Sequence, residues 1–373
     1  MQGNCYHGPV SSPARPERVV VAMSGGVDSS VAAARLVRAG YEVVGLTLHL
    51  WDYPDDGSVR GRCCAPEDQY DARRVADALG IPHFSFDRRD LFRKDVVDPF
   101  VTGYLEGTTP SPCVTCNKTV KLPEILTLAD RLGAGRIATG HYARIGVDGS
   151  GRSFLRRAVD ETKDQSYFLH ALPDTTLARL LFPLGEATKA EVRAEASALA
   201  LPGAAKGESQ ELCFVPTGTY DEFVASHADG RVRPGRIVDA AGREVGQHAG
   251  VHRFTVGQRR GLGVALGEPA YVTATDAGTG TVHLGSRAAL LAARAEIDEA
   301  TFASDFDDVA TASVKIRAHH RGESARVERT GTDTASVTFA TPVAAVAVGQ
   351  YAVFYEGDRV RGGGRIARVT GRT

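Results

Sequence analysis

Residues 18–30, RVVVAMSGGVDSS, constrain the fold more than any other segment of this chain. The apolar run 19–23 has the length and the continuous hydrophobicity of a strand that is buried on both faces. It leads directly into two glycines and then into a helical pattern. This succession forms an anion site, because glycines let the backbone approach a phosphate and the first-turn N–H groups of a helix point at it. We therefore predict an α/β domain whose first strand ends at a phosphate site.

The side chains of this turn add further chemistry. Ser24, Ser29 and Ser30 carry hydroxyl donors, and Asp28 is an acceptor suited to a metal ion that bridges phosphates. The turn is not the common P-loop, since no Lys follows the glycines, and it is not Gly-x-Gly-x-x-Gly. It resembles the pyrophosphate loop of the ATP pyrophosphatases, which cut ATP between its α and β phosphates and adenylate a substrate. An ordinary glycine turn is the alternative, and the complete run after a buried strand argues against it.

The composition indicates a soluble globular protein of two or three domains. The chain has 373 residues, of which 43% are hydrophobic and 24% charged, and no apolar run reaches the length that crosses a membrane. Residues 1–17 lack the apolar core of a signal peptide, so we expect a flexible leader and a cytoplasmic protein. In such a reducing compartment the six cysteines are more often catalytic, metal-binding or buried than paired in disulfides.

Strand and helix patterns alternate over the first part of the chain. We expect strands at 42–49, 83–86 and 136–139, and helices at 65–79, 92–105, 118–132 and 187–199. This alternation predicts a doubly wound parallel sheet, which binds ligands beyond the carboxyl ends of its strands. The segments 24–28, 49–52 and 140–141 then converge on one crevice.

The pattern changes after residue 226. Short stretches rich in Val, Ile, Thr and Phe then alternate with turn residues, which predicts small β domains or a barrel. These stretches lie at 236–238, 270–275, 281–284, 313–317, 335–339 and 351–355. We therefore divide the chain into a leader (1–17), a catalytic α/β domain (18–225), a central β domain (226–288) and a C-terminal β-barrel (289–373).

Two cysteine-bearing segments are the next candidates for chemistry. In 109–118, TPSPCVTCNK, we expect the prolines to stiffen a loop and both cysteines to lie just before a helix, where Lys118 and Lys121 favour the thiolate. The Cys113-x-x-Cys116 spacing also fits a redox dithiol or half of a zinc site, which would need two more ligands. Cys213 lies in 207–215, GESQELCFV, and a lone cysteine is more often a small buried residue than a nucleophile.

Several segments together resemble the tRNA-specific 2-thiouridylases, which put sulfur on the wobble uridine of certain tRNAs. The resemblance implies an adenine nucleotide alpha-hydrolase-like fold and ATP with Mg²⁺ as cofactors. It also implies transfer of sulfur from a protein persulfide to C2 of the uridine, with release of AMP and pyrophosphate. The matching segments follow the order of the family and span most of the chain: 23–30, 112–121, 138–144, 163–169, 209–214 and 254–263.

The resemblance also implies roles for individual residues. Cys116 is the nucleophile, and Cys213 carries a persulfide delivered by a donor protein, a cysteine desulfurase or a sulfur-relay carrier. A disulfide between these two cysteines is the expected by-product. The nucleotide would be held by Ala22, Met23, Ser24, Gly25, Gly26, Val27, Asp28, Ser29, Leu48 and Gly140. The target base or the rest of the tRNA would be contacted by Ser111, Pro112, Cys113, His141, Lys163, Asp164, Gln165, Arg317, Ala318 and Gln350.

This chain departs from the family at two positions. Family members often carry an acidic residue, proposed as a general base, where this chain has Cys113. The base is then elsewhere, or water serves, or the role is dispensable. An aromatic residue is common at the place of Ala318. This chain has no ring at that predicted tRNA contact.

Basic residues agree with an RNA partner. Residues 226–263 contain seven arginines against three acidic residues, and a further basic stretch, expected to be strand-like, lies at 315–321. Such arginines would bind phosphates without reading sequence. Two other classes remain open. One is an amide-forming ligase of the same ATP pyrophosphatase group, and the other is a non-catalytic tRNA-binding protein with a vestigial loop. We expect a monomer.

Overall fold

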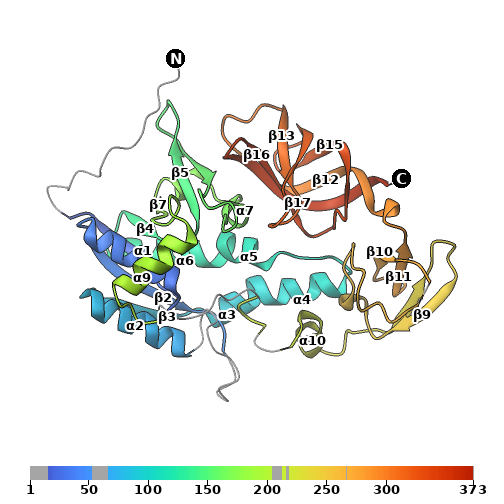
Figure 1. Cartoon of the computed structure of the whole chain (residues 1–373), viewed down its shortest axis with the longest axis horizontal. Helices are drawn as coiled ribbons and strands as arrows, with labels where there is room; N and C mark the ends of the chain where they lie inside the picture. The colour runs from blue at the N-terminus through green and yellow to red at the C-terminus, as the bar shows by residue number, and fades with distance from the viewer. Residues whose placement is uncertain (1–15, 53–65, 204–211, 216–217, 266, 373) are drawn as a thin grey trace.

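The computed structural model describes residues 16–52, 66–203, 212–215, 218–265 and 267–372. Cys5, Cys63, Cys64 and most of the expected leader lie outside this part of the chain. The described elements are built around three sheets (Figure 1). None of the described helices is both long enough and apolar enough to cross a lipid bilayer.

The first sheet has five parallel strands in the order β3-β2-β1-β4-β7 (Figure 1). Because helices cover both of its faces, the middle of its central strand is buried, and Val19, Val20 and Val21 have no exposed surface. The doubly wound sheet predicted from the sequence is therefore confirmed. The strands are β1 (Arg18–Ala22), β2 (Glu42–His49), β3 (His83–Asp87), β4 (Arg136–Ala138) and β7 (Leu180–Leu181).

Helices are present where the sequence predicted them, although two π turns interrupt them, and the short helices at 166–169, 174–177 and 220–226 were not predicted. The segment expected as one helix over 92–105 contains α3 (Arg89–Phe92), the π-helix η1 (Arg93–Val97) and α4 (Asp98–Leu105). The other helices are α1 (Val27–Arg38), α2 (Pro66–Leu79), α7 (Ser166–Leu169), α8 (Asp174–Leu177), α9 (Lys189–Ala198) and α10 (Tyr220–Ser226).

The helix that carries the first cysteine pair begins earlier than predicted. It starts with α5 (Pro112–Thr115), continues through the π-helix η2 (Cys116–Lys121) and ends with α6 (Leu122–Arg131). The prediction of a start at Lys118 was wrong, because Pro112 occupies the first helical turn, where its missing N–H costs nothing. Cys113 and Cys116 are therefore helical residues and do not lie in a preceding loop.

A four-stranded sheet in the order β10-β11-β8-β9 follows. It has a small core of its own, in which Val272 and Val282 are fully buried. It contains β8 (Gly235–Val238), β9 (Glu244–His248), β10 (Tyr271–Asp276) and β11 (Thr281–Gly285), with the 3₁₀ turns η3 (Val251–Arg253) and η4 (Ala288–Leu290) nearby.

The last six strands form a closed barrel, since β12 pairs with both β15 and β17. The expected C-terminal barrel is thus confirmed, although the basic stretch 315–321 is not strand-like, because β13 ends at Lys315 and a turn follows. The strands are β12 (Leu291–Phe302), β13 (Val309–Lys315), β14 (Glu323–Arg329), β15 (Ala335–Ala344), β16 (Tyr351–Glu356) and β17 (Arg359–Arg372).

A hairpin that the sequence analysis missed connects the first part to this barrel. Strands β5 (Ala143–Val147) and β6 (Ser153–Arg157) pair with each other, and β6 joins β17 through the partners Arg156 and Arg359. The exact limits of the three domains stay a prediction.

Candidate functional site

The predicted phosphate loop lies at the carboxyl end of β1. Gly25 adopts φ +75°, and a Cβ at this position would lie 2.1 Å from the Asp68 carbonyl oxygen, so only glycine fits. Gly26 is the N-cap of α1 and, having no side chain, does not cap the first-turn N–H groups. Ser29 Oγ donates to the Gly26 carbonyl (3.0 Å) and accepts from Ser24 N (3.1 Å), which fixes the loop. The loop has the open N–H groups that an anion site requires.

The other residues predicted to hold the nucleotide lie close to this loop. A Cβ on Gly140, which follows β4, would lie 2.7 Å from Ser29 N and 2.8 Å from the Asp28 carbonyl carbon. Met23 N donates to the Leu46 carbonyl (2.8 Å), and Leu48, 7% exposed, ends the buried part of the neighbouring strand. The carboxyl ends of β1, β2 and β4 therefore meet at this loop, as predicted. The other two residues of the predicted set flank the loop in the sequence. Ala22 is half-buried and Val27 is buried.

Asp28 is bound by two side chains that the sequence analysis did not select. Lys189 Nζ lies 2.7 and 2.8 Å from the two Asp28 carboxylate oxygens, and the Tyr142 hydroxyl donates to Asp28 Oδ1 (2.9 Å). Lys189 is the first residue of α9, which Thr188 and Glu191 cap reciprocally. In the sequence, only this capping pattern marks the start of the helix that carries Lys189. The lysine lies 161 positions from Asp28. A cation thus lies beside the predicted phosphate site.

The loop fits a nucleoside triphosphate with Mg²⁺. Gly25 and Gly140 let neighbouring backbone segments pack directly against the loop, since a Cβ at either position would overlap backbone atoms, and Asp28 supplies one carboxylate. Mg²⁺ is commonly held by one or two carboxylates together with substrate phosphates. Among the described residues no group of three or more His, Cys, Asp or Glu side chains is arranged to hold a metal ion. The phosphates would therefore provide most of the oxygen ligands.

The two cysteines of the helix differ in exposure. Cys113 is exposed, whereas Cys116 is 7% exposed and packs in the main hydrophobic core at the start of the π turn. Single π turns inside helices are frequent at functional sites. In this conformation Cys113, and not Cys116, presents its side chain at the surface, and Cys116 must move to reach a substrate.

Cys213 is held next to an aromatic cluster. It is half-buried against the same hydrophobic core as Cys116. The next residue, Phe214, is 1% exposed and packs with its ring centroid 5.1 Å from Phe100 and 6.2 Å from Trp51. Trp51 also packs against Phe223, with ring centroids 5.8 Å apart. Cys113, Cys116 and Cys213 are present as thiols, so the expected disulfide is not formed in the structure.

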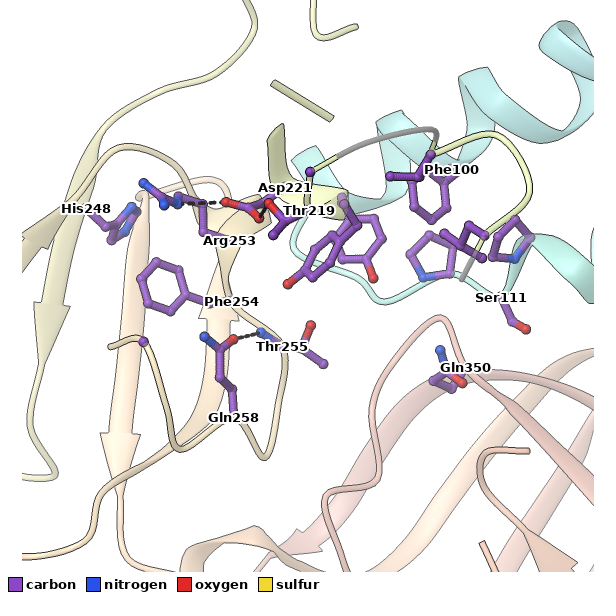
Figure 2. A pocket seen from close by; sticks show the side chains of 18 of the residues that line it. Phe100, Ser111, Thr219, Asp221, His248, Arg253, Phe254, Thr255, Gln258 and Gln350 are labelled. Carbon is purple, nitrogen blue, oxygen red and sulfur yellow. Dashed lines mark hydrogen bonds and ion pairs between the residues drawn. The ribbon is translucent and has the colours of Figure 1, made fainter. Parts of the chain in front are cut away.

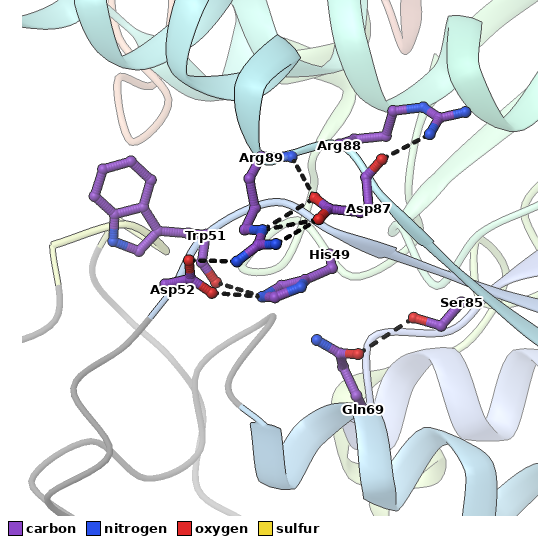
Figure 3. A network of polar contacts seen from close by, with 8 residues as sticks. All are labelled: His49, Trp51, Asp52, Gln69, Ser85, Asp87, Arg88 and Arg89. Carbon is purple, nitrogen blue, oxygen red and sulfur yellow. Dashed lines mark hydrogen bonds and ion pairs between the residues drawn. The ribbon is translucent and has the colours of Figure 1, made fainter.

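A polar network organises the ends of β2 and β3 beside Trp51 (Figure 3). Arg89 NH1 donates to Asp52 (2.6 Å), and the Arg89 guanidinium also binds Asp87, whose pKa it holds well below the usual range. His49 Nε2 lies 3.2 Å from Asp52 Oδ1. These contacts fix the chain just after β2, which in turn fixes the indole that packs on Phe214.

A cavity of about 1220 Å³ opens beside the cysteine helix (Figure 2). Its wall includes Ser111, Pro112 and Cys113 from the start of that helix, and Leu212 and Val215 from either side of Cys213. The opposite wall is formed by the segments 247–249, 253–255 and 261–263 of the central part, and Gln350 of the barrel completes it. The structure therefore brings the two cysteine segments, predicted from distant parts of the sequence, to one cavity.

Aromatic rings make much of the cavity wall apolar. The Tyr104 and Tyr220 rings lie 4.8 Å apart, and both hydroxyls hydrogen-bond to Thr255. Burial raises the pKa of both tyrosines and lowers that of His248, so these three groups are neutral near pH 7. Such a wall suits a flat, uncharged ring such as a nucleobase.

The residues predicted to contact tRNA differ in their exposure and in their contacts within the protein. The Asp164 carboxylate, 2% exposed, accepts from Ala158 N and Ser166 N and lies 4.0 Å from Lys315 Nζ. Gln165 Oε1 accepts from Tyr142 N (2.8 Å). The side chains of Asp164 and Gln165 are thus engaged within the protein.

The other predicted contacts lie on turns and strand ends. The His141 ring bonds Thr139 Oγ1 (2.7 Å), and burial lowers its pKa to about 3. In the turn after β13, Arg317 is exposed, while Ala318 packs against the main core. Gln350 Nε2 donates to the Thr109 carbonyl (2.9 Å) at the cavity. Of the predicted arginine cluster, Arg243 and Arg253 are paired with carboxylates, and these pairs reduce the local positive charge.

Comparison with known families matches the chain in three consecutive pieces. Residues 17–217 match the family described as tRNA methyl transferase HUP domain, residues 221–286 its PRC-barrel domain, and residues 295–366 an aminomethyltransferase beta-barrel domain. Two relatives are both named tRNA-specific 2-thiouridylase MnmA. The protein of Sorangium cellulosum is 61% identical over 96% of this chain and 94% of its own length, and that of Chloroflexus aggregans is 48% identical over 94% and 98%.

Two solved structures are similar to part of this chain, with low TM-scores. A 4-thiouridine synthetase in complex with RNA and ATP has a TM-score of 0.36 and 14% identity over 58% of this chain and 51% of its own. The NMN synthetase of Francisella tularensis has a TM-score of 0.33 and 14% identity over 58% and 78%.

Proposed function

Because this chain belongs to the family of tRNA-specific 2-thiouridylases, we propose that it uses ATP to transfer sulfur from a cysteine persulfide to C2 of the wobble uridine of tRNA. It is an enzyme of tRNA sulfur transfer. One observation carries the finer proposal. The cavity that is lined by Cys113 is also lined by Leu212 and Val215, from either side of Cys213, and by residues of all three parts of the chain. We expect the enzyme to act in the cytoplasm, where tRNA and ATP meet.

The first chemical step would activate the uridine. The C2 oxygen is a poor leaving group, and its attack on the α-phosphorus of ATP makes it part of an adenylate while pyrophosphate leaves. The open N–H groups at the start of α1 and the ammonium of Lys189 are placed to stabilise the negative charge that develops on the phosphates. Mg²⁺, held by Asp28 and phosphate oxygens, would supply further positive charge there.

The second step would replace the oxygen by sulfur. The terminal sulfur of a Cys213 persulfide attacks C2, the C2–O bond breaks, and AMP leaves. The Cys116 thiolate then attacks the Cys213 sulfur, which releases 2-thiouridine and joins the two cysteines. The sulfane sulfur gains two electrons in this step, the thiol pair loses them, and an external thiol must restore the pair. Thiolates are strong nucleophiles near neutral pH, which suits them to this role.

The burial of Cys116 sets a condition on this scheme. Since Cys113 lines the cavity and Cys116 is in the core, the first turn of the helix must rearrange when tRNA binds. Cys113 is the competing candidate for the nucleophile. The two assignments differ in which single substitution abolishes sulfur transfer.

Nucleoside mass spectrometry of tRNA, incubated with the protein, ATP and a persulfide donor, tests the proposal. We expect 2-thiouridine with the unaltered protein and none with Cys116→Ser or Cys213→Ser, while Cys113→Ser retains activity as the matched control. Absence of thiolated uridine with the unaltered protein would refute the proposed reaction and favour a ligase or a binding protein. Loss of activity in Cys113→Ser but not in Cys116→Ser would reverse the assignment of the nucleophile.

A further inference from the structure

We infer that Thr275 and Gln350 are positioning residues for the reacting cysteines, because they hold from two sides the segment that leads into helix α5. This segment, residues 107–111, is the leader loop; it is distinct from the N-terminal leader (1–17). Its contacts come from the central sheet and from the barrel, the two parts of the chain to which RNA binding is ascribed. The catalytic part of this inference rests on the proposed function, whereas its structural part does not.

The barrel binds both backbone polar groups of Thr109. Thr109 N donates to the Val348 carbonyl (2.9 Å), and Gln350 Nε2 donates to the Thr109 carbonyl (2.9 Å). Between these two contacts lies Gly349, with φ +90°, where a Cβ would lie 2.9 Å from Thr109 N. The barrel therefore approaches the leader loop closely enough that only glycine is tolerated at the point of contact.

The barrel side of this contact is itself fixed. Gly349 N donates to the Ile366 carbonyl (2.9 Å), and Ile366 N donates to the Gln350 carbonyl (2.7 Å). The turn that binds Thr109 is thus tied to strand β17. The next residue, Tyr351, is 5% exposed and hydrogen-bonds Thr115 in the cysteine helix. The barrel therefore contacts the leader loop before Cys113 and the cysteine helix after it.

The central sheet binds the other end of the leader loop. Thr275 Oγ1, on β10, donates to the Gly107 carbonyl (2.7 Å). Gly107 has φ +76°, and a Cβ there would lie 3.0 Å from the Thr275 hydroxyl oxygen. This contact crosses 168 positions of sequence. The central sheet thus holds the leader loop at Gly107, and the barrel holds it at Thr109.

The leader loop passes directly into the cysteine turn. Ser111 is the N-cap of α5, and its carbonyl accepts from Val114 N (3.2 Å). A displacement of the loop is therefore transmitted to Cys113 and Cys116 through helical hydrogen bonds. Because one of these sulfurs faces the cavity and the other is buried, the orientation of this turn decides which thiol is presented.

This arrangement gives Gln350 a role that differs from the direct tRNA contact predicted from the sequence. Its amide donates to the Thr109 carbonyl. Loss of the amide should therefore lower the rate of the chemical step more than the affinity for tRNA. The same expectation applies to Thr275, which no motif in the sequence pointed to.

The test uses three threonine variants of the full chain. Thr275→Val removes the hydroxyl at constant volume, and Thr275→Ser retains it. Thr273→Val is the matched control, because Thr273 is on the same strand and its hydroxyl donates to the His283 carbonyl within the central sheet. We expect Thr275→Val to reduce the single-turnover rate of thiolation at saturating tRNA by about 3- to 10-fold, the value of one hydrogen bond. The dissociation constant for tRNA should change less than about twofold, Thr275→Ser should restore the rate, and Thr273→Val should match the unaltered protein.

Amide hydrogen exchange of the peptide that contains Thr109 supplies an independent readout without RNA or ATP. We expect faster exchange there in Thr275→Val and in Gln350→Ala and no change in Thr273→Val. Unchanged exchange, or a loss confined to tRNA affinity, would overturn the inference. If the unaltered protein does not thiolate tRNA at all, the proposed function has failed, and the exchange measurement still decides whether these residues hold the leader loop.

Discussion

Substitution of Gly140 by alanine should weaken nucleotide binding without disrupting the sheet. A Cβ at this position would lie 2.7 Å from Ser29 N, whereas ordinary van der Waals contact begins at 3.4 Å, a shortfall of about 0.7 Å. The obstructing atoms are backbone atoms of the phosphate loop, so no side chain can rotate away. Overpacking of this kind costs about 1–3 kcal/mol. If the loop must return to its original place to bind phosphate, the same energy lowers nucleotide affinity by roughly 5- to 150-fold.

The control for this experiment is Gly135→Ala, at the other end of β4. Gly135 has no atom within 4 Å of its built Cβ, and its φ lies outside the left-handed region. Calorimetric titration with a non-hydrolysable ATP analogue and a thermal unfolding curve would be recorded for both variants. We expect weakened binding only in Gly140→Ala. Wild-type affinity in Gly140→Ala, or equal loss in both variants, would refute the placement of the phosphate site at this loop.

Three further predictions concern single side chains. Lys189→Met should reduce AMP formation in a single turnover at least about tenfold, because the cation beside Asp28 is lost. Lys189→Arg keeps a cation there and should retain part of the activity. Equal rates in Lys189→Met and the unaltered protein would exclude Lys189 from the reaction. Burial lowers the pKa of His170 to about 4. The unfolded chain therefore binds a proton at this residue at higher pH than the native protein does. The free energy of unfolding should fall as the pH drops from about 6.5 to 4, by at most about 3 kcal/mol. His170→Gln should flatten this decline in urea unfolding, and an unchanged slope would contradict the shift. Phe214→Ala should cost about 3–5 kcal/mol and move the emission of Trp51, the only tryptophan, to longer wavelength; unaltered emission would show that the two rings do not pack.

The elements that the sequence predicted well are those encoded by local pattern. The buried run 19–23 and the glycines after it determine strand, turn and helix within thirteen residues, and the structure has β1 and α1 there. The late start assigned to the cysteine helix was a misinterpretation of Pro112. We treated it as a loop residue, although proline is common in the first turn of a helix.

What the sequence could not supply are contacts between distant segments. The pairing of β6 with β17 joins Arg156 to Arg359, and no periodicity reports such a partner. Lys189 is an unremarkable helix residue until the fold places it beside Asp28. The same limit applies to the cysteines, because the sequence identifies both thiol segments but does not reveal that Cys113 lines the cavity while Cys116 is buried.

The most direct test of the proposed mechanism is a stoichiometric count in one turnover. Protein carrying one persulfide on Cys213 would be mixed with tRNA and ATP, without sulfide or reductant, and 2-thiouridine and AMP would be quantified together. The mechanism predicts at most one of each per protein molecule, in equal amounts, with turnover resuming when a thiol reductant and a persulfide donor are added. Thiolation beyond one per protein under these conditions, or 2-thiouridine without AMP, would contradict it.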